Sequence, residues 1–215
     1  MMMMMMMTTS TAEAASRAHA DECRLIHAKE LLGKYYEHSV VKSGENWSQL
    51  NSQVGAFTVR AMRSSSRGVS RAVANVILSE SKRYELDPLF VAAVIQSESS
   101  FNPRAHGDAG EIGMMQLLPA TAEWVAKKYG LPWRGAKTLL DPVMNIRIGT
   151  AYIDFLRDRF DSHSRLYLSA YNMGARNVDR ALKKNIWPRD YASRVMKNYV
   201  GYYAQMAGRT KKALN

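Results

Sequence analysis

The sequence of 215 residues predicts an all-α fold. Apolar residues recur with helical spacing along most of the chain. The pair Asp-Pro occurs at 87–88 and again at 141–142, where Asp can cap a helix and Pro can occupy its first turn. We find no hairpin signature and few alternating runs. With 47% hydrophobic residues, the chain can bury a sizeable core.

The N-terminal part is expected to be a partly helical appendage to one main domain. Residues 12–37 have a helix-forming composition. Residues 38–68 have a weaker period and contain Gly44, Gly55 and the Ser-rich run 64–68, which suggests a flexible link. The predicted division is a tail or signal remnant at 1–20, an appendage at 21–68, the main domain at 69–208 and a C-terminal tail at 209–215.

The opening of the chain has two interpretations. The run Met1–Met7 is short for the apolar part of a signal peptide, and no basic segment precedes it. The triplet Ala18-His19-Ala20 nevertheless resembles a signal-peptidase site, after which a mature chain would start at Asp21. The alternative is a polar tail or a cloning artefact.

The main domain is expected to begin with two helices. Asp87-Pro88 starts the second, and Leu89–Ile95 is apolar all round, which indicates a helix buried on every side. A buried strand of this length would have the same composition, but the Asp-Pro start favours the helix. The first helix has one apolar face: Val69, Val73, Val76, Ile77 and Tyr84.

Helices are also expected in the second half of the domain. Pro119 opens one that Gly130 ends. The others are expected at 141–160, 166–171 and 191–203.

The net charge of +11 favours a polyanionic partner, namely nucleic acid, anionic lipid or an acidic cell-wall polymer. No zinc-finger, basic-zipper or RNA-binding sequence is present, which argues against nucleic acid. No run of about 18 apolar residues occurs, so we expect no stable membrane insertion. The single Cys23 excludes an internal disulfide, and the five His residues are scattered, so we predict neither a metal nor a cofactor.

Glu98 stands out because it follows the most apolar segment of the chain. If Asp87 caps the helix, Glu98 lies about three turns later, at its C-terminal end. Apolar neighbours and the negative helix end would both raise its pKa. A carboxylic acid that is protonated near neutral pH can act as a general acid. The alternative is a surface Glu that ends a helix and hydrogen-bonds the loop.

Four motifs then follow in order over residues 85–205, and together they resemble the soluble lytic transglycosylase family, relatives of goose-type lysozyme that cleave peptidoglycan. The first 68 residues lie outside the resemblance. The motifs are Glu98-Ser99 with Phe101, Pro103 and Ala105; Gly113-Met114-Met115-Gln116 with Leu118, Pro119, Thr121 and Ala122; Asp141-Pro142 with Asn145, Ile146, Gly149 and Tyr152; and Ala170-Tyr171-Asn172-Met173-Gly174.

The resemblance implies a lysozyme-like helical domain with a substrate cleft, which makes 69–208 the catalytic domain. It makes Glu98 the catalytic acid, which protonates the oxygen between N-acetylmuramic acid (MurNAc) and N-acetylglucosamine (GlcNAc). The substrate's acetamido group would stabilise C1, so no second carboxylate is needed. The same Glu98 would then take the proton from the muramic O6, which closes a 1,6-anhydro ring.

The resemblance also gives roles to other residues, and four of them have an alternative. Ser99 would orient Glu98 or the acetamido group, or cap a loop. Gln116 suits sugar amides and hydroxyls. Tyr171 would hold a sugar, or belong to the core. Asn172 would brace the loop or touch the sugar, and Met115 would line the cleft or pack in the core.

The sequence departs from the family in three places. Gly107 stands where many members carry a Ser near the glycan, so that contact is lost or moved to Asp108 or the backbone. The stretch 186–191 lacks the usual Glu-Thr before Tyr191, so that carboxylate is missing or displaced to Asp190. Glu111 occupies a position that is often small. If it faces the cleft, it could activate water as in a hydrolytic lysozyme; otherwise it is a solvated loop charge.

The first hypothesis is therefore a monomeric lytic transglycosylase acting on peptidoglycan strands in the periplasm or cell envelope. The alternatives are a hydrolytic muramidase and a wall-binding component of a secretion or invasion machine. In the last case residues 21–68 would dock an envelope protein.

Overall fold

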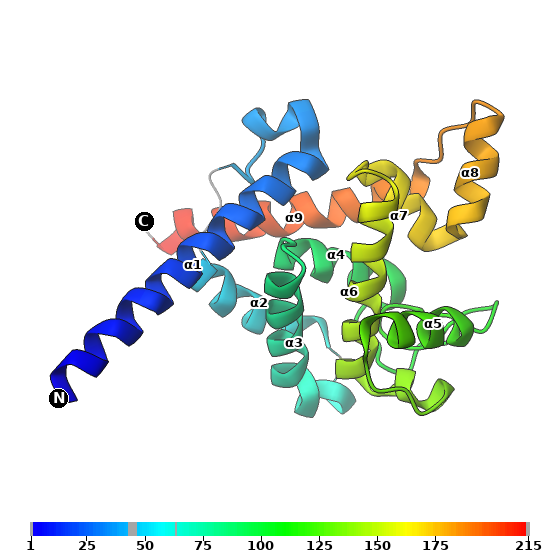
Figure 1. Ribbon diagram of the computed structural model, residues 1–215. Helices are drawn as coiled ribbons and strands as arrows, with labels where there is room; N and C mark the ends of the chain where they lie inside the picture. Colours follow the sequence, from blue (N-terminus) through cyan, green and yellow to red (C-terminus); the bar gives the residue numbers. More distant parts are fainter. Residues whose placement is uncertain (1, 43–46, 63, 214–215) are drawn as a thin grey trace.

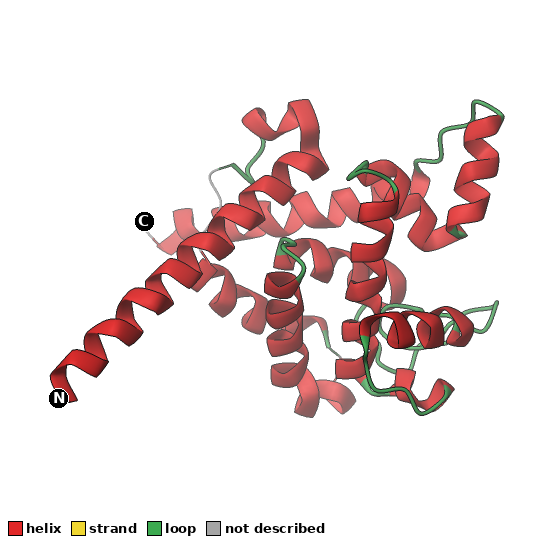
Figure 2. Cartoon of the chain, viewed as in Figure 1, coloured by secondary structure: helices red, strands yellow, loops and turns green. Residues whose placement is uncertain are grey.

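A computed structural model of the protein describes residues 2–42, 47–62 and 64–213. Figure 2 shows helices joined by loops throughout this part, which contains isolated bridges but no strand, so the predicted all-α class is confirmed. The α-helices of the described part are α1 (Met2–Leu32), α2 (Trp47–Ala61), α3 (Ser70–Arg83), α4 (Pro88–Ser99), α5 (Pro119–Tyr129), α6 (Pro142–Arg159), α7 (Ser164–Met173), α8 (Ala175–Lys183) and α9 (Asp190–Ala213). Short 3-10 helices are η1 (Gly33–His38), η2 (Ser64–Val69) and η3 (Ala136–Leu140).

Helix α4 lies at the centre of the domain, in contact with α2, α3 and α9 (Figure 1). Its start is the predicted one: the Asp87 side chain accepts a hydrogen bond of 2.8 Å from the amide of Leu89, and Pro88 occupies the first turn. Every side chain from Leu89 to Ile95 is buried, as the apolar run predicts. The sides of α4 are therefore covered by the surrounding helices, and only its C-terminal end reaches the surface.

The predicted starts of α5 and α6 and the predicted end of α5 are also confirmed, whereas α7 and α9 are longer than the predicted 166–171 and 191–203. Asp141 accepts hydrogen bonds from the amides of Val143 and Met144 at the start of α6. Pro119 opens α5, and Gly130 ends it with a left-handed backbone (φ 65°) that glycine adopts without strain. Helix α8 and the 3-10 helices were not predicted.

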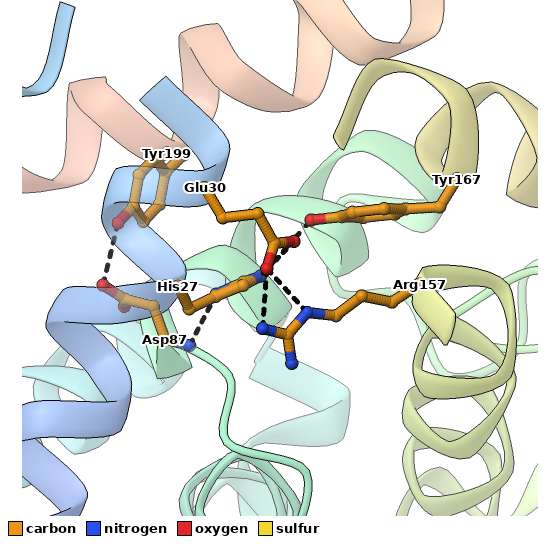
Figure 3. A network of polar contacts seen from close by, with 6 residues as sticks. All are labelled: His27, Glu30, Asp87, Arg157, Tyr167 and Tyr199. Carbon is orange, nitrogen blue, oxygen red and sulfur yellow. Dashed lines mark hydrogen bonds and ion pairs between the residues drawn. The ribbon is translucent and has the colours of Figure 1, made fainter. Parts of the chain in front are cut away.

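Helix α1 is joined to the domain by a buried polar network (Figure 3). The Nδ1 atom of His27 accepts a hydrogen bond of 3.0 Å from the amide of Asp87, and burial lowers the pKa of His27 well below its usual value. The neutral ring then carries its proton on Nε2, which lies 3.3 Å from the hydroxyl of Tyr167. Next to it, Glu30 accepts two hydrogen bonds from Arg157, of 2.6 and 2.8 Å.

The same network reaches α9 through the buried Asp87 carboxylate. Tyr199 and Tyr203 donate hydrogen bonds of 2.8 and 2.6 Å to its Oδ2 atom. Arg24 on α1 donates to Tyr203 and lies 3.9 Å from the same carboxylate. Asp87 therefore does more than cap α4: it connects α1, α4 and α9.

The described residues of the segment 38–68 are more helical than its composition suggests, while Gly44 lies outside the described residues. They include α2, where Leu50 and Val54 are buried and the hydroxyl of Thr58 donates back to the carbonyl of Val54; Met62, just after the helix, is also buried. These positions are four residues apart, but Ser, Asn and Gly between them weaken the pattern. The Ser-rich run predicted as a link forms η2, and α3 starts after Val69, which is exposed. The division into four segments stays a prediction.

Candidate active site

A cleft of about 520 Å³ lies at the C-terminal end of α4. Five of the seven predicted site residues line it, namely Glu98, Glu111, Gln116, Tyr171 and Asn172. Ser99 and Met115 are not among the lining residues. Asp108, the possible replacement for the contact missing at Gly107, also lines it, and so do residues without a predicted role in substrate binding, including Ser97, Thr121, Tyr152, Met173 and Arg194.

Glu98 occupies the last turn of α4, where the chain reverses. Ser100 and Phe101 both have left-handed backbones (φ 51° and 61°), and the side chain of Phe101 is buried under the turn. Burial is the main cause that raises the pKa of Glu98 from 4.5 to about 7, and the negative charge of Glu111 adds to it. A hydrogen bond from Tyr191 and the positive charge of Arg194 act in the opposite direction.

Tyr191 is the direct partner of Glu98. It lies in the first turn of α9, and its hydroxyl donates a short hydrogen bond to Oε1 of Glu98. Burial raises the pKa of Tyr191 well above its usual value, so the hydroxyl stays a donor. This segment lacks the usual carboxylate, and Asp190 is the predicted replacement. Asp190 is exposed and does not line the cleft, whereas its neighbour Tyr191 contacts the acid.

The loop between α4 and α5 is held by Asn145 of α6. The Asn145 Oδ1 atom accepts a hydrogen bond of 2.8 Å from the amide of Met115, and its Nδ2 donates to the carbonyls of Ile112 and Leu139. Gly113 lies against this amide with φ 83°, and a Cβ there would lie 2.3 Å from Nδ2 of Asn145. Only glycine fits this position, which explains the glycine that begins the second motif.

Ser99 and Tyr171 also contact this loop. The hydroxyl of Ser99 donates to the carbonyl of Met114 at 2.8 Å, and that of Tyr171 donates to the carbonyl of Met115 at 2.8 Å. Met115 is buried against Gly149, where a Cβ would lie 2.4 Å from the Met115 sulfur. Ser99 and Met115 therefore position the loop, whereas Tyr171 both holds the loop and lines the cleft.

Gly107 and Glu111, two of the departures from the family pattern, are structurally linked. A Cβ on Gly107 would lie 2.3 Å from Oε2 of Glu111 and 2.9 Å from Oε1 of Gln116. Oε2 of Glu111 also accepts a hydrogen bond of 3.0 Å from the amide of Ala109. The Glu111 carboxylate thus occupies the space beside Gly107 that a serine side chain would need.

Gln116 has a left-handed backbone (φ 46°), and its Nε2 donates to the carbonyl of Gly113 at 2.8 Å. This bond orients the side-chain amide, so that its Oε1 lies beside Gly107 at the cleft wall. Gln116 can therefore offer an acceptor to a hydroxyl or amide of a bound sugar.

The cleft lining contains carboxylates, amides, hydroxyls and aromatic rings, but neither His nor Cys. Elsewhere in the described residues, His19 and Cys23 of α1 come together with Glu85, with ligand atoms within 4.8 Å of one another. The spacing of the His residues along the sequence does not predict this group. The side chains of His19 and Glu85 are largely exposed, and none of the three lines the cleft.

The fold and the site together define a class of protein: a helical domain that presents one partly buried carboxylic acid, whose pKa is raised to about 7, in an open polar and aromatic cleft. Such an acid suits general acid catalysis on glycans. The family model of the transglycosylase SLT domain matches residues 75–193, more than half of the chain. The chain therefore belongs to this family.

Named relatives agree with the family. The chain is 36% identical over 118 residues to the transglycosylase of Enterobacteria phage PRD1, which covers 55% of this chain and 39% of the relative. It is 33% identical over 102 residues to the soluble lytic murein transglycosylase of Escherichia coli K12, which covers 45% of this chain and 16% of the relative. The chain thus spans about a sixth of that relative's length.

Solved structures confirm the predicted lysozyme-like helical fold. An inactive mutant of the lytic transglycosylase Slt from Pseudomonas aeruginosa, in which a glutamate is replaced by glutamine, has a TM-score of 0.57 and 29% identity, over 65% of this chain and 25% of that one. The 70-kDa soluble lytic transglycosylase in complex with bulgecin A has a TM-score of 0.55 and 25% identity, over 66% of this chain and 26% of that one.

Proposed function

We propose that this chain is a peptidoglycan lytic transglycosylase that cleaves the MurNAc-β-1,4-GlcNAc bond without water and leaves 1,6-anhydro-MurNAc ends. The observation that carries the proposal is Glu98, a partly buried acid with a pKa of about 7 in a cleft built from the family motifs. The inactive glutamate-to-glutamine mutant of the Pseudomonas relative supports the dependence on one glutamate.

In the first step Glu98 donates its proton to the glycosidic oxygen, and the bond from that oxygen to C1 of MurNAc breaks. The substrate's acetamido oxygen adds to C1 as the GlcNAc leaves. The Glu98 carboxylate that results is stabilised by the hydroxyl of Tyr191 and by the charge of Arg194. In the second step this carboxylate takes the proton of the muramic O6, which attacks C1 and releases the acetamido oxygen.

A pKa near 7 suits a group that has both tasks. An acid with the ordinary pKa of 4.5 would be almost fully ionised at neutral pH, and a much weaker acid would be slow to donate. Burial raises the pKa, and Tyr191 and Arg194 limit the rise. The two steps therefore use the same residue in its two protonation states.

Hydrolysis is the second candidate function, because Glu111 lines the same cleft as Glu98. A carboxylate there could activate a water molecule in place of the O6 attack. The two functions differ in their products, which mass spectrometry of digested sacculi distinguishes. The proposed function predicts muropeptides with anhydro ends, lighter by one water. Muropeptides with reducing ends alone would refute it in favour of hydrolysis.

The pH dependence gives a prediction for the acid. Because Glu98 must be protonated to start the reaction, kcat/KM is expected to fall as the pH rises through about 7. Tyr191→Phe removes a hydrogen bond that favours the charged Glu98 carboxylate, so it should move this falling limb of the pH profile to higher pH. Glu111→Gln removes a negative neighbour, so it should move the limb to lower pH.

Initial rates of anhydro-muropeptide release over a pH series would measure both shifts. Salt and protein concentration are kept constant across the series, because the charge of the wall also varies with pH. Shifts of both variants in the same direction, or of neither, would contradict the assignment of this limb to Glu98.

The expected location is the periplasm or cell envelope, where a basic chain suits a wall rich in carboxylates. None of the helices in the described residues has the length and apolar character of a membrane span.

Docking of an envelope protein by residues 21–68 would use the exposed side chains of this segment, such as Ile26, Tyr35 and Val59, because others are buried in the domain. Pull-down with alanine at these three positions would test it; unchanged capture would count against docking.

A further inference from the structure

We propose that glycan binding extends beyond the cleft onto an aromatic ridge, formed by Tyr171, Tyr152, Phe155 and Trp124, with an N-acetylhexosamine ring stacked on Trp124. This inference rests on the proposed function, because it names a further contact for the same strand. Neither Phe155 nor Trp124 belongs to the motifs that carry the family resemblance.

The aromatic ridge is continuous from the cleft outward. Tyr171 and Tyr152 both line the cleft, and their ring centroids are 5.5 Å apart. Tyr152 and Phe155 lie nearly parallel with centroids 6.4 Å apart. Phe155 then meets Trp124 edge to face at 4.7 Å. Each ring contacts the next, so the ridge continues one wall of the cleft.

Two neighbouring helices set this geometry. Leu118, just before α5, and Thr121 on α5 both line the cleft, and Trp124 follows three residues after Thr121 on the same face of the helix. On α6, which contacts α5 (Figure 1), Phe155 stands one turn after Tyr152. Both rows therefore run from the cleft in one direction, and they meet at the contact of Trp124 with Phe155.

Trp124 is exposed for 45% of its surface, although its ring is held by Phe155. An exposed indole that does not fill the core offers an apolar surface beside the cleft. A sugar ring presents an apolar face of C–H groups between its polar edges, so it can cover such a surface. Lys128, one turn further on α5, lies 5.5 Å from the Phe155 ring centroid and ends the apolar row with a charge.

The occupant is a glycan strand because the surface continues the cleft. A β-1,4-linked strand is extended, so a strand bound at Glu98 passes over one of the neighbouring surfaces. The ridge offers the aromatic faces that sugars need, and Gln116 and Asn172 in the cleft offer the polar contacts. Long strands should therefore benefit from Trp124, and short ones that fill only the cleft should not.

The test uses binding rather than turnover, in the full chain carrying Glu98→Gln. The dissociation constants of chitohexaose and chitotriose are measured by calorimetry, with and without Trp124→Ala. We expect about tenfold weaker binding of chitohexaose, the size of effect that burial of one sugar face would give, and unchanged binding of chitotriose. Trp124→Phe keeps a ring and should lose less.

Trp187→Ala is the matched control. Trp187 is similarly exposed, at 53%, but it lines a different cavity, with Tyr35 and Arg189. Its removal should leave the binding of both sugars unchanged. Unchanged binding of chitohexaose by Trp124→Ala would overturn the proposal, and so would an equal loss for both sugars. The Glu98→Gln variant is not expected to cleave glycan, so its sugar binding is measured without any reaction. A failure of the anhydro-product assay would therefore leave the binding result valid, and the two proposals can fail separately.

Discussion

Replacing Glu98 by glutamine is expected to lower the release of anhydro-muropeptides by about a thousandfold, because a positioned acid-base group contributes that much to proton transfer. The glutamine keeps the shape of the side chain and an acceptor for the hydroxyl of Tyr191. It cannot donate a proton to the glycosidic oxygen or take one from O6. Product release from purified sacculi, followed by mass spectrometry, would measure the loss.

The control for this variant is Glu123→Gln, which changes an exposed carboxylate of α5 that does not line the cleft. It should keep the full rate.

Loss of activity by unfolding is not expected for Glu98→Gln. Burial raises the pKa of Glu98 from 4.5 to about 7, so its contribution to stability is complete below about pH 4.5 and is lost as the pH rises through 7. Above this pH the glutamine variant should be at least as stable as the wild type. A fully active Glu98→Gln variant would show that Glu98 is not the catalytic acid.

The largest expected loss of stability is that of Asp87→Ala. Asp87 is buried, and the variant would leave the hydroxyls of Tyr199 and Tyr203, the amide of Leu89 and the charge of Arg24 without this acceptor. Removing one partner of a buried, hydrogen-bonded charge pair costs about 3–5 kcal/mol. We therefore expect the free energy of unfolding to fall by about 4 kcal/mol.

Asp141→Ala is the matched control, because Asp141 also precedes a proline and caps a helix, but it is exposed. Loss of an exposed cap costs about 1 kcal/mol. Urea unfolding monitored by circular dichroism would give both values. Equal costs for the two variants would show that Asp87 acts only as a cap and that its contacts with α1 and α9 contribute little.

The sequence predicted best those features that depend on neighbouring residues. The two Asp-Pro pairs and the Pro119 to Gly130 segment carry their own capping chemistry, so the helix ends follow from a few residues. The burial of α4 followed from its apolar composition, which leaves no face for water. Helix α2 was missed because its weak helix formers hide a buried row that only packing reveals.

The surroundings of Glu98 were predicted only in part. Its place at the end of α4 and its raised pKa follow from the local sequence. Its hydrogen bond to Tyr191 joins residues 93 positions apart, so it depends on how α9 crosses α4 and could not be read from either segment. For the same reason the place of Arg194 in the cleft could not be read from its own segment. The contact of Glu111 with the space beside Gly107 likewise appears only in three dimensions.

Helix α9 holds α4 at both ends, through Tyr199 and Tyr203 at Asp87 and through Tyr191 at Glu98. The last turn of a helix usually frays, and its amides exchange with solvent through small local openings. Here the turn that carries the acid is tied to the same helix that closes the far end of α4. Exchange of its amides then requires separation of α4 from α9, which is close to unfolding of the whole domain. Loss of activity on heating and loss of the fold should accordingly be one event.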